Sequence, residues 1–148
     1  MLFRSLDVVA RARPHVVAHN IETVERLTPT VRDRRATYRQ SLRVLEYLKR
    51  APEKLYTKSS IMVGLGETDE EILQVMRDLR EHNVDMLTIG QYLQPSKHHL
   101  PVARFAHPDE FRMFGEEAGR MGFVNAASGP IVRSSYHADR QAQDAGAV

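Results

Sequence analysis

The sequence predicts an α/β fold built on parallel strands. The first observation is the stretch Tyr56–Tyr92, in which an apolar run, a glycine turn, an amphipathic segment and a second apolar run follow one another. A helix that connects two strands in this way makes them parallel, with a right-handed crossover. The second observation is that helical and extended segments also alternate before this stretch. The predicted order is therefore α, β, α, β, α, β.

Composition limits the classes of protein to which the chain can belong. Its 148 residues are 42% hydrophobic and 27% charged, which is enough for one packed domain and fits neither a disordered nor a membrane-embedded chain. The net charge is only +2 and the basic residues are scattered, so we expect no nucleic acid partner. No apolar run is long enough to span a bilayer, so we expect no membrane partner. The absence of cysteine excludes disulfides and thiolate-held metal centres made by this chain alone.

Two helices are predicted before the stretch Tyr56–Tyr92, which we call the central unit. Residues 2–13 place apolar side chains on one helical face, and the helix must end near Pro14 because the residue before a proline avoids helical angles. The three arginines of this stretch leave a transit peptide as the alternative. Pro29 prevents a long helix in residues 24–34, and residues 38–48 then repeat apolar side chains at helical steps.

A short strand is predicted between these helices. Residues 15–20 read as a buried strand, and Asn20 and Glu22 alternate with Ile21 directly after it. Alternate residues of an extended segment point to the same side, so the two polar side chains share one face. In a buried position both need partners, which a ligand or the neighbouring backbone could supply.

The central unit collects polar side chains at one end. Residues 59–63 form its first strand and residues 85–92 its second, and Gly64–Glu67 makes a tight turn because glycine accepts backbone angles that other residues resist. Glu67 follows the first strand and Gln91 lies at the end of the second. The loops after the carboxyl ends of parallel strands usually carry the site. The alternative for Glu67 is a solvated turn residue near a helix N-terminus.

The helix between these strands has a predicted start and stop. Thr68 and Glu71 have the spacing of a capping box, in which each side chain bonds the backbone N–H of the other residue. Asn83 is expected to end the helix in the left-handed conformation.

The histidines that follow raise the question of a metal site. His98 and His99 lie in a loop bracketed by prolines, and His107 precedes the next helix. Adjacent histidines on an extended chain point apart, and no H-E-x-x-H pattern is present, so a histidine-dependent metal hydrolase is only an alternative.

The rest of the chain is predicted as a helix, a strand, a turn, a closing segment and a frayed tail: residues 107–120, 123–127, 128–130, 131–139 and 141–148.

Four segments carry a family resemblance, in the same order as in the family: His19–Thr23, Val63–Thr68, Gln91–Ser96 and Arg133–Asp139. Together they resemble the C-terminal half of the lipoyl synthases, which are radical S-adenosylmethionine enzymes. The resemblance implies a partial TIM-like βα barrel that contains only the later βα units, with parallel strands and outer helices. It also implies that residues 1–141 are the C-terminal part of the radical SAM core and that residues 142–148 are a disordered tail.

The family's chemistry is the insertion of two sulfur atoms into a protein-bound octanoyl chain. The resemblance implies S-adenosylmethionine and two [4Fe–4S] clusters as cofactors, one to form the adenosyl radical and one to supply sulfur. It implies octanoylated lipoyl domains or the glycine cleavage H protein as partners. The implied location is the cytoplasm, or the mitochondrion in a eukaryote.

The resemblance also assigns roles to individual residues. A serine of the last segment would be an oxygen ligand of the sulfur-supplying cluster, with Ser134 favoured over Ser135. Arg133 would be catalytic, near that cluster or the substrate. The residues expected to bind S-adenosylmethionine and substrate are Asn20, Glu22, Gly64, Gly66, Glu67, Gln91 and Tyr92.

The departures from the family pattern decide what this chain can do alone. The family binds its clusters through two cysteine triplets in an N-terminal half that this sequence lacks. We therefore expect the isolated chain to be inactive and to depend on the missing half or on a complementing chain. The alternative is a non-catalytic scaffold that binds lipoyl domains. An open half-barrel is also expected to be poorly soluble or to self-associate. Ser60 stands where the family pattern would have glycine.

Overall fold

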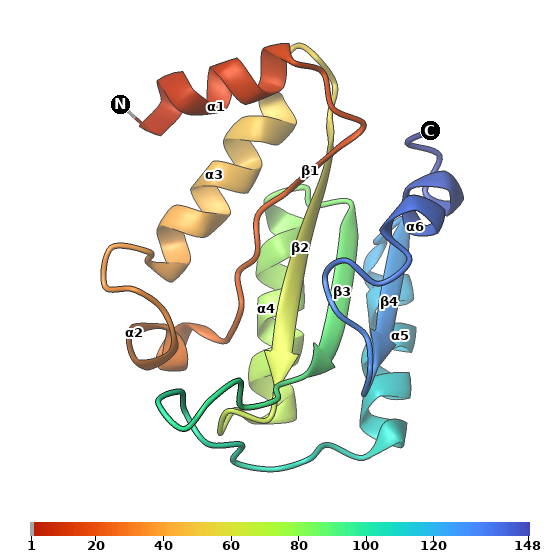
Figure 1. Cartoon of the computed structure of the whole chain (residues 1–148). Helices are drawn as coiled ribbons and strands as arrows, with labels where there is room; N and C mark the ends of the chain where they lie inside the picture. Colours follow the sequence, from red (N-terminus) through yellow and green to blue (C-terminus); the bar gives the residue numbers. More distant parts are fainter. Residues whose placement is uncertain (1) are drawn as a thin grey trace.

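The fold is an open sheet of four parallel strands in the order β1-β2-β3-β4 (Figure 1). The computed structural model describes residues 2–148. The strands are β1 (Val16–Ala18), β2 (Tyr56–Val63), β3 (Met86–Gln91) and β4 (Asn125–Gly129). All three neighbouring pairs are parallel and each joins strands that are consecutive in sequence. This confirms the predicted α/β class and the partial barrel of successive βα units.

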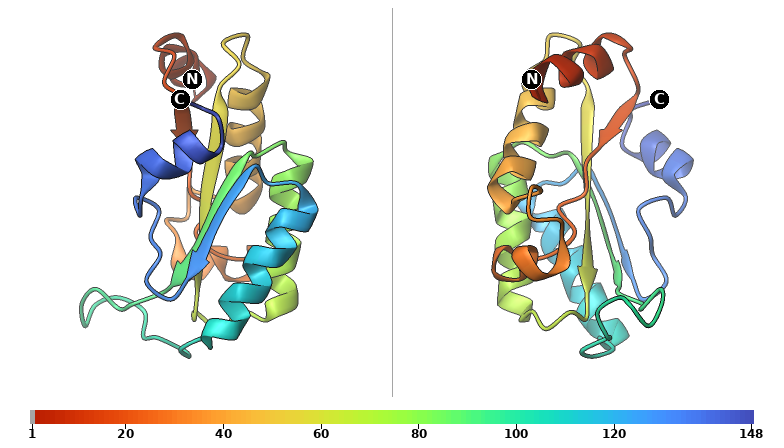
Figure 2. Two further views of the ribbon diagram at one scale, coloured as in Figure 1. Left: turned by 90° about the vertical axis from the view of Figure 1, so that its right-hand side faces the viewer. Right: turned by 60° about the vertical axis from the view of Figure 1, so that its left-hand side comes forward.

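The sheet lies between a helical layer and the C-terminal segment, as the left view of Figure 2 shows. The helical layer contains α3 (Tyr38–Arg50), α4 (Asp69–Glu81) and α5 (Pro108–Met121). The opposite face is crossed by the chain after β4, which ends in α6 (Ala138–Asp144). The remaining elements are α1 (Leu2–Arg11), which contacts α3, and η1 (Glu25–Leu27) and α2 (Thr28–Val31) in the loop after β1. None of the helices in residues 2–148 has the length and apolar character that a membrane crossing requires.

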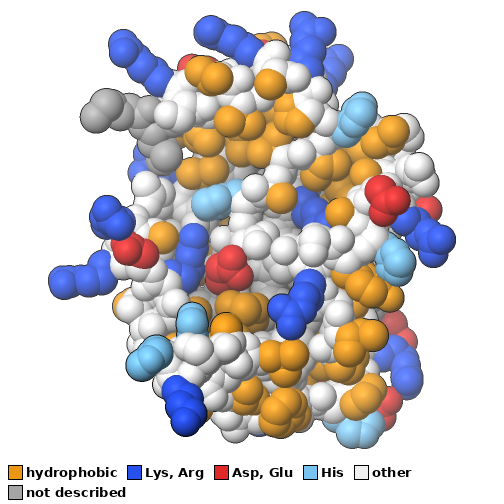
Figure 3. All heavy atoms as spheres, viewed as in Figure 1, with side chains coloured by type: hydrophobic (Ala, Val, Ile, Leu, Met, Phe, Trp, Pro, Cys, Tyr) orange, Lys and Arg blue, Asp and Glu red, His pale blue; other side chains and the backbone are white. Residues whose placement is uncertain are grey.

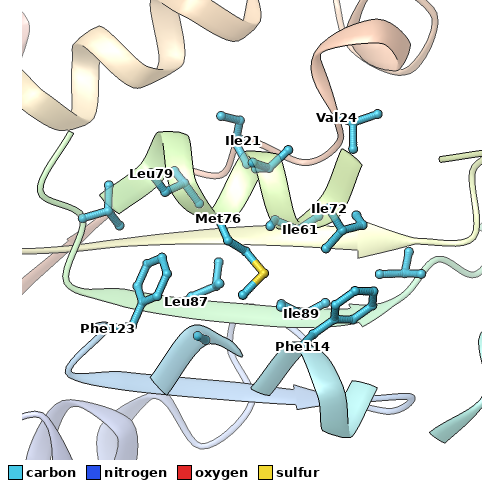
Figure 4. Packing of buried hydrophobic residues seen from close by; sticks show 14 of the residues in the cluster. Ile21, Val24, Ile61, Ile72, Met76, Leu79, Leu87, Ile89, Phe114 and Phe123 are labelled. Atoms are coloured by element: carbon cyan, nitrogen blue, oxygen red, sulfur yellow. The ribbon is translucent and has the colours of Figure 1, made fainter. Parts of the chain in front are cut away.

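The core fills the space between the sheet and the helical layer (Figure 4). Ile61 and Leu87 point from neighbouring strands toward Met76 of α4, and all three side chains are fully buried. Side chains alternate along a strand, so the residues between these positions face the opposite side of the sheet. Lys58 and Ser60 of β2 therefore belong to the face that the C-terminal segment crosses.

The helix ends agree with the sequence at α4 and add a cap at α5. Thr68 Oγ1 accepts the backbone N–H of Glu71 at 3.2 Å, and Asn83 adopts a φ of 61°, as predicted. A reciprocal cap occurs at α5, where His107 Nδ1 accepts the Asp109 N–H at 3.1 Å and the Glu110 carboxylate accepts the His107 N–H at 3.0 Å. Histidine is an uncommon cap residue, so the prediction of a helix over residues 107–120 did not include this cap.

Three strand predictions need correction. The strand predicted over residues 59–63 begins earlier, at Tyr56, because its first three residues pair with β1. The strand predicted over residues 15–20 covers only Val16–Ala18 and is half exposed, because β1 has a neighbour on one side only. The last strand was predicted over residues 123–127 but begins at Asn125 and continues to Gly129. Phe123 is buried against the helical layer instead of pairing in the sheet, so the strand starts later.

The C-terminal end is more ordered than expected. Residues 142–148 were expected to be a disordered tail, but α6 continues to Asp144. Gln141 and Ala142 are buried, since this helix packs on the face of the sheet opposite the other helices. The apolar half-barrel interior that we expected to be exposed is therefore partly covered by the chain's own end.

One buried polar link joins α3 to α4 and gives a testable pH dependence. The Tyr38 hydroxyl donates to Asp78 Oδ2 at 2.6 Å, and both residues are buried. Burial and the bonded Asp78 carboxylate raise the pKa of the Tyr38 phenol well above its ordinary value. A pKa raised by folding contributes stability that is complete below the unfolded-state pKa of about 10 and is lost as the pH rises above it.

We expect Tyr38→Phe to lower the free energy of unfolding at pH 8 by about 1–2 kcal/mol, because Asp78 loses a buried donor. Above about pH 10 the difference in free energy of unfolding between the wild type and the variant should become smaller. Only the wild type gains free energy from ionising the Tyr38 phenol on unfolding. Urea unfolding at pH 8 and at pH 11 measures the gap. Tyr136→Phe, which removes a more exposed phenol, is the control. A gap that is constant with pH would contradict the assignment.

Candidate functional site

A cavity of about 190 Å³ lies on the sheet face that the C-terminal segment crosses. Its walls come from the ends of three successive strands and from the chain after β4, and Figure 3 shows this side of the molecule. The cavity brings together six of the residues that the sequence predicted for the site: Asn20, Glu22, Gln91, Tyr92, Arg133 and Ser134. Ser60, where the family pattern would have glycine, also lines it. We call this space the strand-end cavity.

Glu22 reaches the strand-end cavity through an unusual backbone conformation. Its N–H donates to the Ser60 carbonyl at 3.0 Å, and its own carbonyl accepts from Met62 N–H at 2.8 Å. These bonds continue the pairing of β1 with β2 past the end of β1. Glu22 has a φ of 71°, which is uncommon for a residue other than glycine and is typically found at functional positions.

A larger hollow of about 750 Å³ adjoins the strand-end cavity. The two spaces share Glu22, Met62, Tyr92 and Pro95. The outer wall is the loop after β3, which the Tyr92 hydroxyl holds by donating to the Leu100 carbonyl at 2.7 Å. Pockets of about 300–1,000 Å³ hold ligands of small-molecule size, so the combined space can take a cofactor of that size.

The C-terminal segment closes the strand-end cavity from above. Val132 is buried so close to β3 that a Cβ on Gly90 would lie 1.9 Å from the Val132 carbonyl oxygen. Lys58 Nζ donates to the Ser134 carbonyl at 2.9 Å. These contacts put Arg133 and Ser134 over the strand ends. Ser135 lines neither of the two spaces.

Glu67 closes its own turn. One carboxylate oxygen accepts Gly64 N–H at 2.6 Å and the other accepts Leu65 N–H at 2.9 Å. Only 4% of Glu67 is exposed, so the alternative of a solvated turn residue is wrong. Gly64 and Gly66 have φ values of 111° and 112°, which confirms the glycine-dependent turn. Neither glycine nor Glu67 lines the strand-end cavity, and their contact with a cofactor stays a prediction.

Gln91 stands at the cavity wall, but its amide holds a loop. Its Nε2 donates to the Arg104 carbonyl at 3.0 Å, and its Oε1 accepts Ala106 N–H at 2.9 Å. The amide therefore fixes the long connection between β3 and α5. Cofactor binding by Gln91 stays a prediction. Any such contact must use the hydrogen-bonding capacity of the amide that the bonds to Arg104 and Ala106 leave free.

The role of Glu67 in the turn can be measured. Glu67→Ala should lower the free energy of unfolding by about 1–3 kcal/mol, because two backbone N–H groups lose their acceptors in a buried place. Glu70→Ala is the matched control one turn away, since the Glu70 carboxylate is exposed and pairs only with Arg77. Chemical denaturation of both variants checks this. An equal, small effect of the two substitutions would contradict a role of Glu67 in closing the turn.

The histidines have separate positions in the structure. His107 caps α5 by accepting Asp109 N–H on its Nδ1, and His99 Nδ1 lies 2.8 Å from Ser96 Oγ. His98 and His99 line the outer hollow. Within residues 2–148 there is no group of three or more His, Cys, Asp or Glu side chains arranged to hold a metal ion.

Sequence reasoning did not single out Lys58, which lines neither the strand-end cavity nor the outer hollow but bonds the segment that lies over them. It is 4% exposed and lies on the inner face of β2, where it bonds the segment that carries the two candidate serines. Burial lowers the pKa of its ammonium group. A lysine at the inward position of a strand whose neighbours are small or apolar is the signal that could have identified it.

Comparison with known proteins agrees with the resemblance read from the sequence. The family model described as "Radical SAM superfamily" matches residues 2–79. This range includes β1, β2 and most of α4, and it stops before the segment that contains Ser134.

Similar curated proteins are lipoyl synthases. The chain is 65% identical to the lipoyl synthase of Myxococcus xanthus (strain DK1622) over 135 residues, which cover 91% of this chain and 45% of that protein. It is 59% identical to the enzyme of Cupriavidus metallidurans over 145 residues, or 98% of this chain and 44% of the relative. The enzyme of Ralstonia pickettii is 58% identical over 147 residues, with 99% and 44% covered. The chain thus spans less than half the length of these relatives.

Proposed function

Because this chain belongs to the radical SAM superfamily, we propose that it supplies the strand-end part of a lipoyl synthase active site. The reaction is the insertion of two sulfur atoms into an octanoyl-lysine to give lipoyl-lysine. The substrate is carried by a lipoyl domain or by the glycine cleavage H protein, and the expected compartment is the cytoplasm. The reaction, the substrate carrier and the compartment are what the resemblance to the lipoyl synthases implies, and the name that the matching relatives carry supports the proposal.

One observation carries the proposal. The segment with Arg133 and Ser134 lies over the same cavity as Asn20 and Glu22, although more than a hundred residues of sequence separate the two pairs. Had this segment folded away from the strand ends, a serine ligand and a cofactor cradle could not belong to one site. Their shared cavity supports a common function.

The iron–sulfur clusters do not fit this chain alone. A [4Fe–4S] cluster is normally held by thiolates, and the sequence has no cysteine. Ser134 offers one exposed oxygen, which suits the fourth ligand of a cluster whose thiolates come from polypeptide outside this sequence. Ser135 is the second choice, because it is also exposed but lines neither space.

S-adenosylmethionine fits the character of the strand-end cavity and the adjoining hollow. When bound, it and the clusters supply the radical and the sulfur. The chain's own residues bind and orient: Glu22 presents an acceptor for an ammonium or a ribose hydroxyl, and Asn20 presents an amide. Arg133 is an exposed cation at the rim and suits a carboxylate or another anionic group. Such residues contribute by positioning the reacting groups.

The test combines this chain with the part of the Myxococcus xanthus enzyme that it does not match. Both polypeptides are purified without oxygen. They are then mixed with iron, sulfide, S-adenosylmethionine, reductant and an octanoylated lipoyl domain. Mass spectrometry measures the mass of the lipoyl domain after the reaction. We expect the mass of lipoyl-lysine only when both polypeptides are present. The full-length Myxococcus enzyme is the positive control. No product from the mixture, while the control is active, would refute the proposal.

A pull-down carried out beside this assay separates a scaffold from a catalytic part. The absence of cysteine favours a scaffold as the second candidate, since the chain can bind no cluster alone. A scaffold would retain the octanoylated domain in a pull-down and give no lipoyl-lysine with the complementing polypeptide.

A further inference from the structure

We propose that Lys58 is a positioning residue that holds Ser134 over the strand-end cavity. This role rests on the function proposed above, in which Ser134 provides an oxygen ligand. Lys58 and Ser134 are 76 residues apart in sequence, and the bond between them joins the middle of the sheet to the C-terminal segment.

The burial of Lys58 is unusual because its charge has no carboxylate partner. Lysine is rarely this buried unless it is paired, and Lys58 is 4% exposed. Among residues 2–148, none of the ion pairs includes Lys58, and its ammonium bonds the Ser134 carbonyl. The desolvation of an ammonium group is costly, so a single carbonyl partner at this place indicates a specific role for the bond.

Within residues 2–148, the contacts that hold the C-terminal segment to the sheet include those of Val132, Gln141 and Lys58, and of these three only the Lys58 bond engages Ser134. Val132 packs over Gly90, and Gln141 Nε2 donates to the Leu87 carbonyl at 3.2 Å. Val132 and Gln141 flank the serines on either side. Lys58 acts at the serine itself, and it bonds the carbonyl and not the hydroxyl.

This choice of atom suits a ligand residue. The backbone of Ser134 is fixed, while no hydrogen bond within residues 2–148 engages its Oγ. The Ser134 hydroxyl therefore stays free of hydrogen bonds within the described residues, and Ser134 lines the strand-end cavity. A lysine that bonded the hydroxyl directly would compete with iron for the same oxygen.

The test uses the absence of cysteine from the chain. Ser135→Cys creates a single attachment point for a nitroxide, next to Ser134 and on an exposed residue. The electron paramagnetic resonance spectrum of the labelled chain then reports the mobility of this segment without any cluster. The compared variants are Lys58→Met, Lys58→Arg and, as the matched control, Gln141→Leu, which removes the neighbouring tie.

We expect Lys58→Met to shorten the rotational correlation time of the label by about threefold, because the segment gains local motion. Lys58→Arg keeps a charged donor and should restore most of the wild-type line shape. Gln141→Leu should leave the line shape near that of the wild type. Circular dichroism checks that each variant is folded. Should Lys58→Met not fold, Lys58→Gln, whose side chain is too short for the same bond, replaces it with the same expected result.

An unchanged line shape in the folded Lys58 variant would overturn the role. Equal mobility in the Lys58 variant and in Gln141→Leu would also overturn it, because it would mean general loosening. Either result leaves the proposed function standing, since the lipoyl-lysine measurement does not depend on it. Conversely, a two-polypeptide mixture that forms no lipoyl-lysine refutes the proposed function and has no bearing on the mobility of the spin label.

Discussion

Gly90→Ala is expected to lower the free energy of unfolding by about 3 kcal/mol and to detach the C-terminal segment from the sheet. The new Cβ would lie 1.9 Å from the Val132 carbonyl oxygen and 3.0 Å from the Val132 carbonyl carbon. Both atoms are backbone, so no side chain can rotate away and the segment itself must move. Because Arg133 and Ser134 follow Val132 directly, the strand-end cavity should lose two of its walls.

Gly119→Ala is the matched control for this substitution. Gly119 lies within α5, and a Cβ there meets nothing within 4 Å. Alanine is favoured over glycine inside a helix, so we expect a gain of about 0.5–1 kcal/mol. Urea unfolding of both variants measures the difference. If Gly90→Ala proved as harmless as Gly119→Ala, the close packing of Val132 on β3 would be wrong.

Ser134→Ala is expected to reduce lipoyl-lysine formation in the two-polypeptide mixture by about a hundredfold, as the loss of a metal-site contact commonly does. The free energy of unfolding should change by no more than about 0.5 kcal/mol, because Ser134 is exposed and its hydroxyl makes no hydrogen bond within the described chain. The combination of lost product and unchanged stability would locate the defect in the site. Mass spectrometry of the lipoyl domain and urea unfolding of the chain provide the two measurements.

Ser135→Ala is the control, since it removes the same atom one residue further along. Ser135 lines neither the strand-end cavity nor the outer hollow, so its loss should leave product formation within about twofold of the wild type. The reverse result, with Ser135 essential and Ser134 dispensable, would assign the ligand role to Ser135. Full activity of both variants would mean that neither serine is a required ligand of the cluster.

Features that depend on neighbours in sequence were predictable. Thr68 caps α4, Asn83 ends it in the left-handed conformation, and Gly64 and Gly66 form the turn, because each of these depends on backbone geometry within a few residues. The alternation of the longer helices and strands up to β4 followed from hydrophobic periodicity for the same reason, whereas α2 and α6 were not predicted. Boundaries were less accurate where tertiary contact decides them, as at β1, which lacks a second neighbour, and at β4, where Phe123 joins the core.

The site was only partly predictable from the sequence. The segments that contain Asn20, Glu22 and Ser134 were recognisable by their resemblance to a family, but their shared cavity is a property of the fold. From the sequence, the carboxylate of Glu67 and the amide of Gln91 were both expected to contact a ligand. In the structure both side chains bond the backbone of nearby loops. A polar side chain after a strand can serve either purpose, and only its neighbours in space determine which.

The sequence by itself determined the α/β class, the βα repeat, the family resemblance and the lack of thiolate ligands, since these follow from composition, local spacing and residue identity. The tertiary structure alone decided that Ser134 and not Ser135 lines the strand-end cavity, that Lys58 holds the serine segment, and that α6 covers part of the sheet. These features join residues that are far apart in the chain. Their energies depend on packing and burial, which no local pattern records.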